Sequence, residues 1–158
     1  MKHEIKILTK SEAETVALGR FIGERAERDL FLALIGDLAA GKTHFVQGLA
    51  KGMGISGTVT SPTFTILNFY DGPLFLAHFD FYRLRSEEEL WNIGWEEYAA
   101  GGVTVAEWAE LFPDLIPADA FTFHFIVTGE AEREILISWE SERFAHLGKE
   151  LETYAACD

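Results

Sequence analysis

The sequence lacks the features that mark secreted and membrane proteins. Its 158 residues include one cysteine, Cys157, next to the last position, which excludes an intrachain disulfide and a cysteine-based metal site. No apolar run approaches the roughly 20 residues that cross a bilayer, and the start Met-Lys-His-Glu is unlike a signal peptide. We therefore expect a soluble cytoplasmic protein with no membrane attachment.

Basic residues are scarce as well. Lys and Arg number 13 against 26 Asp and Glu, a formal net charge of −13. Such a surface repels phosphate backbones at long range, so we expect no strong direct binding of nucleic acid. The charge is compatible with docking onto a basic protein partner. Hydrophobic residues make up 48% of the chain, and the length predicts one folded domain over residues 1–158.

One segment carries a specific signal. Residues 36–43 read GDLAAGKT, which has the spacing G-x-x-x-x-G-K-[ST] of a phosphate-binding loop. An uninterrupted apolar run at 30–35 precedes the loop, as in a buried parallel strand, and residues 46–53 follow it with helical spacing. A strand before the loop and a helix after it are the context in which this motif binds nucleoside triphosphates.

Each residue type in the loop has its own task. Glycines allow the backbone to wrap around a phosphate chain so that N–H groups point at the anion. The lysine can reach the β- and γ-phosphates, and the threonine hydroxyl can ligand Mg²⁺. The predicted phosphate-binding residues are Gly36, Asp37, Leu38, Ala39, Ala40, Gly41, Lys42 and Thr43.

Strand and helix patterns alternate along the chain. Strands are expected at 3–8, 30–35, after Thr63 up to Tyr70, and at 74–82, 103–108, 121–127 and 134–139. Helices are expected from Ser11 to about Ala26, after the phosphate-binding loop to Gly52, and at 86–94, 96–100 and 141–154, with a loop at 111–120. The short turn at 71–73 requires antiparallel neighbours. We therefore expect an α/β protein with a single-domain P-loop nucleoside triphosphate hydrolase fold, in which helices flank a mixed sheet with a parallel core and antiparallel hairpins.

Two acidic residues stand at the ends of apolar strands. Asp80 follows FLAHF and Glu107 follows VTVA. A carboxylate that serves Mg²⁺ sits at a strand's carboxyl end, because that edge of the sheet faces the phosphates. Either acid could serve the magnesium, or could merely cap its strand.

Four motifs in this order resemble the TsaE family, also called YjeE. They are GDLAAGKT at 36–43, TSPTF at 60–64, HFDFYRL at 78–84 and VAEW at 105–108. The resemblance runs from about residue 9 to 140. It implies an ATPase subunit of the bacterial machinery that makes threonylcarbamoyladenosine in tRNA, with ATP and Mg²⁺ as cofactors and TsaB and TsaD as partners.

The resemblance also implies a role for individual residues. Lys42 would hold the phosphates, and Thr43 and Glu107 would ligand Mg²⁺. Asp80 would serve the magnesium shell or position the attacking water, so that Lys42, Asp80 and Glu107 form the catalytic set. Further residues implied to contact the nucleotide are Ser11, Thr60, Ser61, Thr63 and Arg133, with Trp108 against the site.

Two positions depart from the family pattern. Ala39 stands where the family usually has glycine, and His44 stands where threonine or serine is frequent. Ala39 is tolerable at negative φ, and we expect His44 to face solvent. Among the remaining histidines, His78 and His124 are expected to be packed strand residues and not metal ligands.

The expected activity is Mg²⁺-dependent ATP hydrolysis that is weak in the isolated chain and rises when partners dock. The candidate arginine fingers are Arg83, Arg85 and Arg133. Two alternative functions remain open: a small-molecule kinase that uses the same phosphate-binding loop, and a sensor that binds ATP without hydrolysing it. A GTPase is disfavoured because no N-K-x-D motif follows the loop.

Overall fold

The chain is built around one β-sheet. The computed structural model describes residues 2–36, 41–56, 67–92, 94–95 and 100–156. The strands are β1 (His3–Thr9), β2 (Phe31–Ile35), β3 (Leu67–Tyr70), β4 (Leu76–Asp80), β5 (Val103–Glu107), β6 (Phe121–Val127) and β7 (Arg133–Trp139). The helices are α1 (Glu12–Glu24), α2 (Lys42–Gly52), α3 (Glu87–Asn92) and α5 (Ala145–Ala156), with 3-10 turns η1 (Phe81–Arg83), η2 (Ala109–Leu111) and η3 (Pro113–Leu115).

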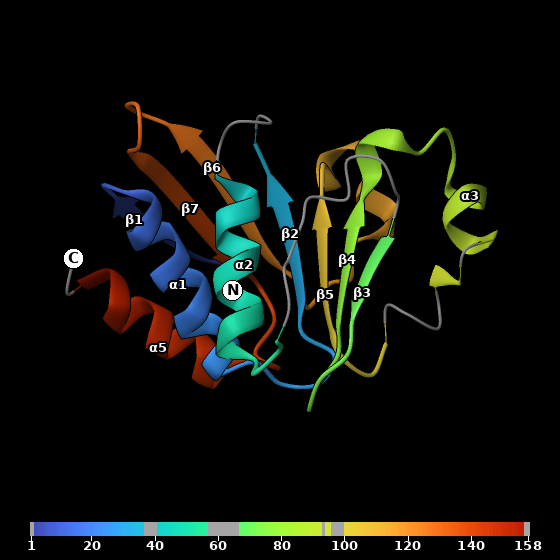
Figure 1. The fold of residues 1–158 in the computed structure, drawn as a ribbon, viewed down its shortest axis with the longest axis horizontal. Helices are drawn as coiled ribbons and strands as arrows, with labels where there is room; N and C mark the ends of the chain where they lie inside the picture. Colours follow the sequence, from blue (N-terminus) through green and yellow to red (C-terminus); the bar gives the residue numbers. More distant parts are fainter. Residues whose placement is uncertain (1, 37–40, 57–66, 93, 96–99, 157–158) are drawn as a thin grey trace.

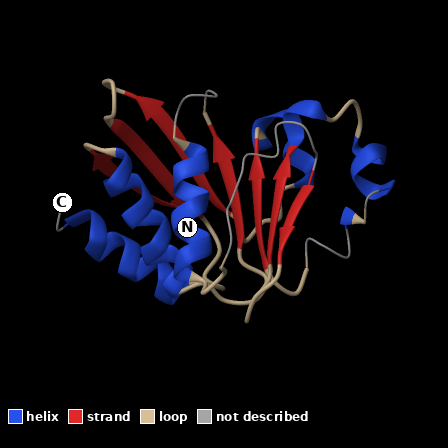
Figure 2. Cartoon of the chain, in the orientation of Figure 1, coloured by secondary structure: helices blue, strands red, loops and turns tan. Residues whose placement is uncertain are grey.

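The seven strands follow the order β1-β7-β6-β2-β5-β4-β3 (Figure 1). The four central strands β6, β2, β5 and β4 are parallel to one another, whereas β1, β7 and β3 pair antiparallel with their neighbours (Figure 2). This arrangement confirms the expected mixed sheet with a parallel core and antiparallel hairpins. Parallel strands end at the same edge, so Ile35, Asp80 and Glu107 are carried to one side of the molecule.

Alternating side chains of the central strands build a hydrophobic core on each face of the sheet. Leu32 and Leu34 of β2 join the larger core under α1, α2 and α5, while Phe31 and Ala33 join a smaller core on the opposite face. Figure 1 shows α1 and α2 side by side against the sheet. The smaller core includes residues of η1, α3 and η2, so both faces of the central strands are covered.

Helices α1 and α2 approach closely because glycines stand at their contact. A Cβ atom added at Gly19 would lie 2.1 Å from the carbonyl oxygen of Phe45, and one at Gly48 would lie 2.0 Å from that of Val16. Either substitution would force the two backbones apart, since real side chains never come so close. This contact fixes α2, and with it Lys42 at its first position, against the rest of the fold.

Ser11 and Glu14 have the spacing of a capping box at the start of α1, and one of the two hydrogen bonds differs from that pattern. The Ser11 hydroxyl accepts a hydrogen bond from the backbone N–H of Glu14 at 3.1 Å. The Glu14 carboxylate accepts from the backbone N–H of Lys10, also at 3.1 Å, one residue earlier than the box pattern predicts. Both bonds satisfy donors near the helix start and hold the β1–α1 junction in place.

Several boundaries differ from the expectation. The strand predicted at 74–82 ends at Asp80, whose carboxylate caps η1. The predicted loop at 111–120 contains η3 and the end of η2. The last helix begins at Ala145 and not at 141. Its preceding turn is held by Arg143, which pairs with Asp29 at 3.2 Å and with Asp119 at 2.8 Å. The helix expected at 96–100 falls almost wholly outside the described residues.

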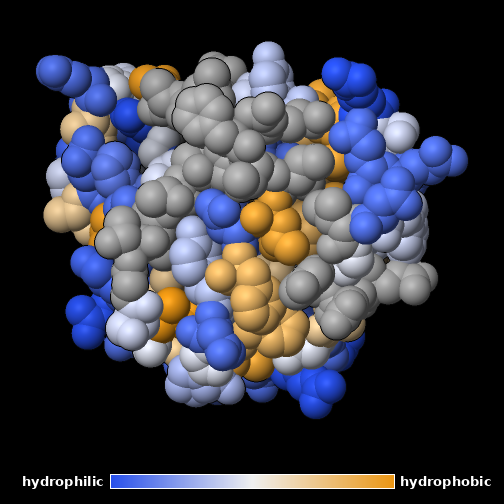
Figure 3. All heavy atoms as spheres, turned by 45° about the vertical axis from the view of Figure 1, so that its right-hand side comes forward, coloured by the Kyte–Doolittle hydropathy of each residue, from blue (hydrophilic) through white to orange (hydrophobic). Residues whose placement is uncertain are grey.

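Most large apolar side chains are buried, and the surface is mixed. Figure 3 shows hydrophobic residues in the middle of one side of the molecule and hydrophilic residues around its margin. Large hydrophobic side chains that remain exposed include Tyr82 in η1 and Leu111 in η2, close to the carboxyl ends of β4 and β5. None of the helices in the described ranges has the length and apolar character that a membrane span requires.

Candidate active site

The candidate site lies where the parallel strands end. β2 leads into Gly36, and α2 begins at Lys42, so the two ends of the phosphate-binding motif are held by a buried strand and a packed helix. Gly36 has φ 145° and Gly41 has φ 90°, values that side-chain-bearing residues rarely adopt. The motif therefore needs glycine at both positions. Residues 37–40 lie outside the described part of the chain, and so do Thr60, Ser61 and Thr63.

Lys42 is a buried cation at the centre of the site. Its side chain is 2% exposed. The Nζ atom donates a hydrogen bond to the carbonyl oxygen of Gly36 at 2.6 Å and lies 3.9 Å from Oε1 of Glu107. It also lies 4.5 Å from the centre of the Trp108 ring, within range of a cation–π contact. The ammonium group thus stands between the loop and the end of β5.

The two acidic residues predicted to serve Mg²⁺ lie side by side. β4 and β5 are paired in a register that places Asp80 opposite Glu107. Both residues are buried, and Asp80 Oδ1 accepts a hydrogen bond from the backbone N–H of Tyr82 at 2.9 Å. Burial raises the pKa of Asp80, and the charge of Glu107 raises it further, while the Tyr82 N–H and Lys42 act in the opposite direction.

The raised pKa predicts that Asp80→Asn stabilises the protein at neutral pH. A carboxyl group whose folded pKa lies above its unfolded pKa opposes folding once it is ionised, and this cost disappears as the pH falls through the folded pKa. Asparagine removes the charge and keeps an oxygen for the Tyr82 N–H. Urea unfolding should give a higher midpoint for the variant at pH 7 and a shrinking difference in acid.

The matched control is Asp71→Asn, which changes an exposed aspartate and should leave the midpoint at pH 7 almost unchanged. A lower midpoint for Asp80→Asn at pH 7 would contradict the assigned cost of this buried charge.

His78, in β4, is a third buried polar residue next to these carboxylates. Its side chain is fully buried, as expected for a packed strand residue, and Nε2 lies 2.5 Å from Oε2 of Glu107. Strand alternation places His78 on the same face as Asp80. Sequence reasoning missed its contact with Glu107, because only the order of the strands puts β5 beside β4.

Trp108 covers the lysine in an unusual backbone conformation. Its φ of 59° and ψ of 36° lie in the left-handed region, a conformation that costs energy for a bulky side chain. The indole ring contacts both Lys42 and the ring of Tyr82, whose centre is 5.0 Å away. Trp108 thus lies against Lys42, and it also packs against the smaller core.

Residues of α1 and of the start of β7 lie close to Gly41. A Cβ atom added at Gly41 would lie 3.7 Å from Nε of Arg133 and 3.9 Å from the methyl group of Thr15. Ser11 caps the helix that carries Thr15. The guanidinium of Arg133 also donates to the carbonyl oxygens of the β6–β7 turn, including Gly129 at 3.1 Å. Arg133 and Thr15 are thus neighbours of Gly41, and Ser11 lies one helical turn before Thr15.

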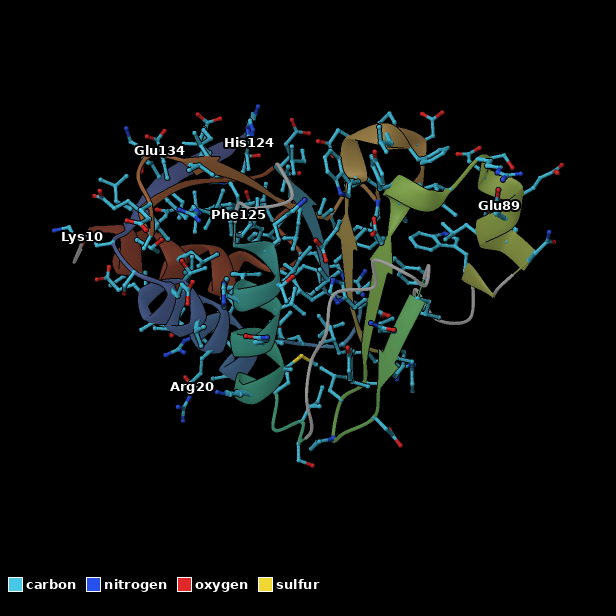
Figure 4. All side chains as sticks on the ribbon, turned by 45° about the horizontal axis from the view of Figure 1, so that its top comes forward. Lys10, Arg20, Glu89, His124, Phe125 and Glu134 are labelled. Atoms are coloured by element: carbon cyan, nitrogen blue, oxygen red, sulfur yellow. The ribbon has the colours of Figure 1, made fainter. Side chains whose placement is uncertain are left out.

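Other candidate residues are spread more widely. His44 is 39% exposed and lies 3.6 Å from Glu12, so it faces the start of α1 at the molecular surface. His124 is exposed, and the expectation that it is packed was wrong: the alternation of β6 buries Phe125 against α2 and turns His124 outward (Figure 4). Arg85 is exposed, and the Arg83 side chain is outside the described part.

The donor set at this edge suits a hard cation next to phosphate. The carboxylates of Asp80 and Glu107, and the hydroxyl of Thr43 at the start of α2, are oxygen donors of the kind that Mg²⁺ prefers. Two neighbouring carboxylates with one lysine would leave a negative charge that a divalent cation would relieve. Burial is the main cause of the raised pKa of Asp80, and the charge of Glu107 adds to it. These residues fit a Mg²⁺ ion that is held together with a phosphate chain.

The parallel core, the glycine-bounded motif between β2 and α2, and the strand-end carboxylates define a P-loop nucleoside triphosphate hydrolase fold. Comparison with known proteins narrows this class. The family model described as "Threonylcarbamoyl adenosine biosynthesis protein TsaE" matches residues 9–135. The chain belongs to the TsaE family.

Individual relatives agree with this assignment. The tRNA threonylcarbamoyladenosine biosynthesis protein TsaE of Treponema pallidum is 41% identical over 135 residues, 85% of this chain and 100% of the relative. The protein of that name in Bacillus subtilis is 39% identical over 150 residues, 94% of each chain. The crystal structure of Bacillus subtilis YdiB is similar with a TM-score of 0.81 and 33% identity, covering 98% of this chain and 97% of that chain.

Proposed function

We propose that this protein is a Mg²⁺-dependent ATPase that serves the threonylcarbamoyladenosine modification of tRNA together with TsaB and TsaD. The observation that carries the proposal is the convergence of Lys42, Asp80 and Glu107 beyond the loop bounded by Gly36 and Gly41. Membership of the TsaE family supports the biosynthetic role, because the family's description names that modification.

Each residue of the site has a proposed task on ATP. Lys42 exchanges its bond to the Gly36 carbonyl for the β- and γ-phosphates, and the N–H groups of the loop hold the remaining phosphate oxygens. Thr43 and Glu107 would ligand Mg²⁺, and the Asp80 carboxylate would orient the attacking water. Bound Mg²⁺ supplies charge neutralisation at the phosphate oxygens.

The remaining predicted contacts complete the nucleotide site. Ser11 and Arg133 would contact the nucleotide, and the Arg133 side chain lies next to Gly41 at the end of the loop. Thr60, Ser61 and Thr63 would form the segment over the γ-phosphate that responds to the state of the nucleotide. The structure describes none of these three residues.

The contacts of Arg133, one of the candidate arginine fingers, support slow turnover in the isolated chain. Arg133 donates to three carbonyl oxygens of its own hairpin turn, at Gly129, Glu130 and Glu132, so its guanidinium is engaged there. An arginine that reaches the transferred phosphate accelerates such reactions by orders of magnitude. We propose that docking of TsaB and TsaD completes the site, and that these partners, not this acidic chain, make the main contacts with tRNA.

The test is phosphate release from ATP and Mg²⁺, measured for the purified chain and again after TsaB and TsaD are added. We expect slow release alone and at least a roughly tenfold rise with the partners. Lys42→Ala with the same partners is the control. Fast release by the isolated chain would contradict the accessory role. ATP binding without release under any condition would favour the sensor, and transfer of phosphate to a small acceptor would favour the kinase.

A further inference from the structure

His78 is a buried polar residue that the proposed ATPase mechanism leaves without a task. Its ring is fully buried in β4, and its contact to Glu107 crosses from that strand to β5. The other ring nitrogen, Nδ1, is also shielded from solvent and has no hydrogen-bond partner within the described residues. A buried polar atom without a partner is rare in folded proteins and calls for an explanation.

The contact with Glu107 indicates which ring nitrogen acts as the donor. A carboxylate oxygen accepts hydrogen bonds, so we assign the hydrogen of this bond to Nε2, which donates to Glu107 Oε2. His78 thus holds one oxygen of the Glu107 carboxylate and leaves the other free of this bond.

The bond to His78 determines which oxygen of Glu107 faces the phosphate-binding loop. His78 holds Oε2 within the sheet, and Oε1 points to Lys42 Nζ at 3.9 Å. A glutamate side chain has three rotatable bonds, so an unheld carboxylate would also sample orientations toward Asp80. Partners of this kind behind a metal ligand commonly fix its orientation.

We propose that His78 is a positioning residue, which holds the Glu107 carboxylate with Oε1 on the Lys42 side of the site, where this oxygen would be available to the Mg²⁺ of a bound nucleotide. This inference rests on the proposed function, because Glu107 is a Mg²⁺ ligand only there. It differs from a packing role, for which the ring's shape would matter and its hydrogen bond would not.

The test compares three substitutions that separate the hydrogen bond from the volume. His78→Gln places an amide N–H near the position of Nε2, His78→Asn is also polar but too short to reach Oε2, and His78→Leu is apolar with similar bulk. The affinity for a fluorescent ATP analogue is measured by titration with Mg²⁺ and again with EDTA. The ratio of the two affinities gives the contribution of Mg²⁺ without any need for turnover.

We expect the ratio to fall by about 10- to 100-fold in His78→Leu and His78→Asn, the usual effect of removing a group that orients a metal ligand. The affinity in EDTA should stay within about threefold of the wild type, and His78→Gln should recover most of the ratio. The comparison of Gln with Asn decides the question even if His78→Leu fails to fold, as circular dichroism would reveal.

Two results would overturn the positioning role. An unchanged ratio in His78→Asn would assign His78 to packing, and equal losses in His78→Gln and His78→Asn would show that the hydrogen bond is not what matters. Failure of the proposed function has a different signature, since the wild-type protein would then gain no affinity from Mg²⁺, and the positioning role would fall with it.

Discussion

Lys42→Ala is expected to abolish detectable ATP binding while the protein stays folded. The ammonium group is buried where the loop ends, and in the proposed complex it makes charge-assisted bonds to two phosphates. Each such bond contributes about 1.5–3 kcal/mol, so affinity should fall at least about 100-fold. Isothermal titration calorimetry with ATP and Mg²⁺ measures this loss directly.

The substitution should lower the free energy of unfolding, because Lys42 is fully buried beside the carboxylates of Glu107 and Asp80, so circular dichroism must first show that the variant is folded. Loss of the lysine removes the bond to the Gly36 carbonyl and the contact with the Trp108 ring, while Glu107 keeps its hydrogen bond from His78. Lys51→Ala is the matched control, because that lysine is exposed near the other end of α2. ATP affinity within threefold of the wild type in Lys42→Ala would refute the site assignment.

Trp108 contacts the same lysine. Its ring lies against Lys42 and Tyr82 in a strained left-handed conformation. Strain of this kind persists only where the surrounding contacts hold it in place, and it occurs often at functional sites. Trp108 thus contacts the buried lysine and also the ring of Tyr82, whose side chain is exposed at the surface.

Local sequence patterns were sufficient for the elements that build the site. The glycines of the loop, the apolar run of β2 and the capping serine of α1 are each specified by neighbouring residues, and the structure contains the predicted strand and helices around them. The short turn at 71–73 likewise determined the antiparallel pairing of β3 and β4. These features depend on backbone chemistry within a few residues.

The neighbours across the sheet could not be read from the sequence. Asp80 lies beside Glu107 because β5 inserts between β2 and β4, and the chain order alone does not specify this insertion. The contact of His78 with Glu107 depends on the same strand order. The left-handed backbone of Trp108 also gives no sequence signal, since that region favours glycine, asparagine and aspartate.

Long-range ion pairs account for the misplaced start of the last helix. Ser141 was expected to open it, yet residues 141–144 form a turn in which Arg143 reaches Asp29 and Asp119 from other parts of the chain. A pattern search over neighbouring residues does not include such partners. The difference affects the opposite edge of the sheet and leaves the candidate site unchanged.

Glu107→Gln is expected to separate nucleotide binding from hydrolysis. The amide keeps the shape of the side chain and an oxygen for the hydrogen bond from His78, but it removes the negative charge that would hold Mg²⁺. Turnover with TsaB and TsaD should fall at least about 100-fold, equivalent to roughly 2.7 kcal/mol of transition-state stabilisation. ATP affinity in EDTA should change by less than about threefold, because Lys42 and the loop remain.

The same substitution makes a second prediction, on stability, that tests the charge arrangement independently of catalysis. Glu107 raises the pKa of the adjacent Asp80, so neutralising Glu107 should lower that pKa and leave the urea midpoint at pH 7 equal to or above that of the wild type. Glu110→Gln changes an exposed carboxylate three residues further on and should alter neither turnover nor midpoint. Turnover within threefold of the wild type in Glu107→Gln would exclude this carboxylate as the magnesium ligand, and Asp80 would then be the remaining strand-end carboxylate that could hold the ion.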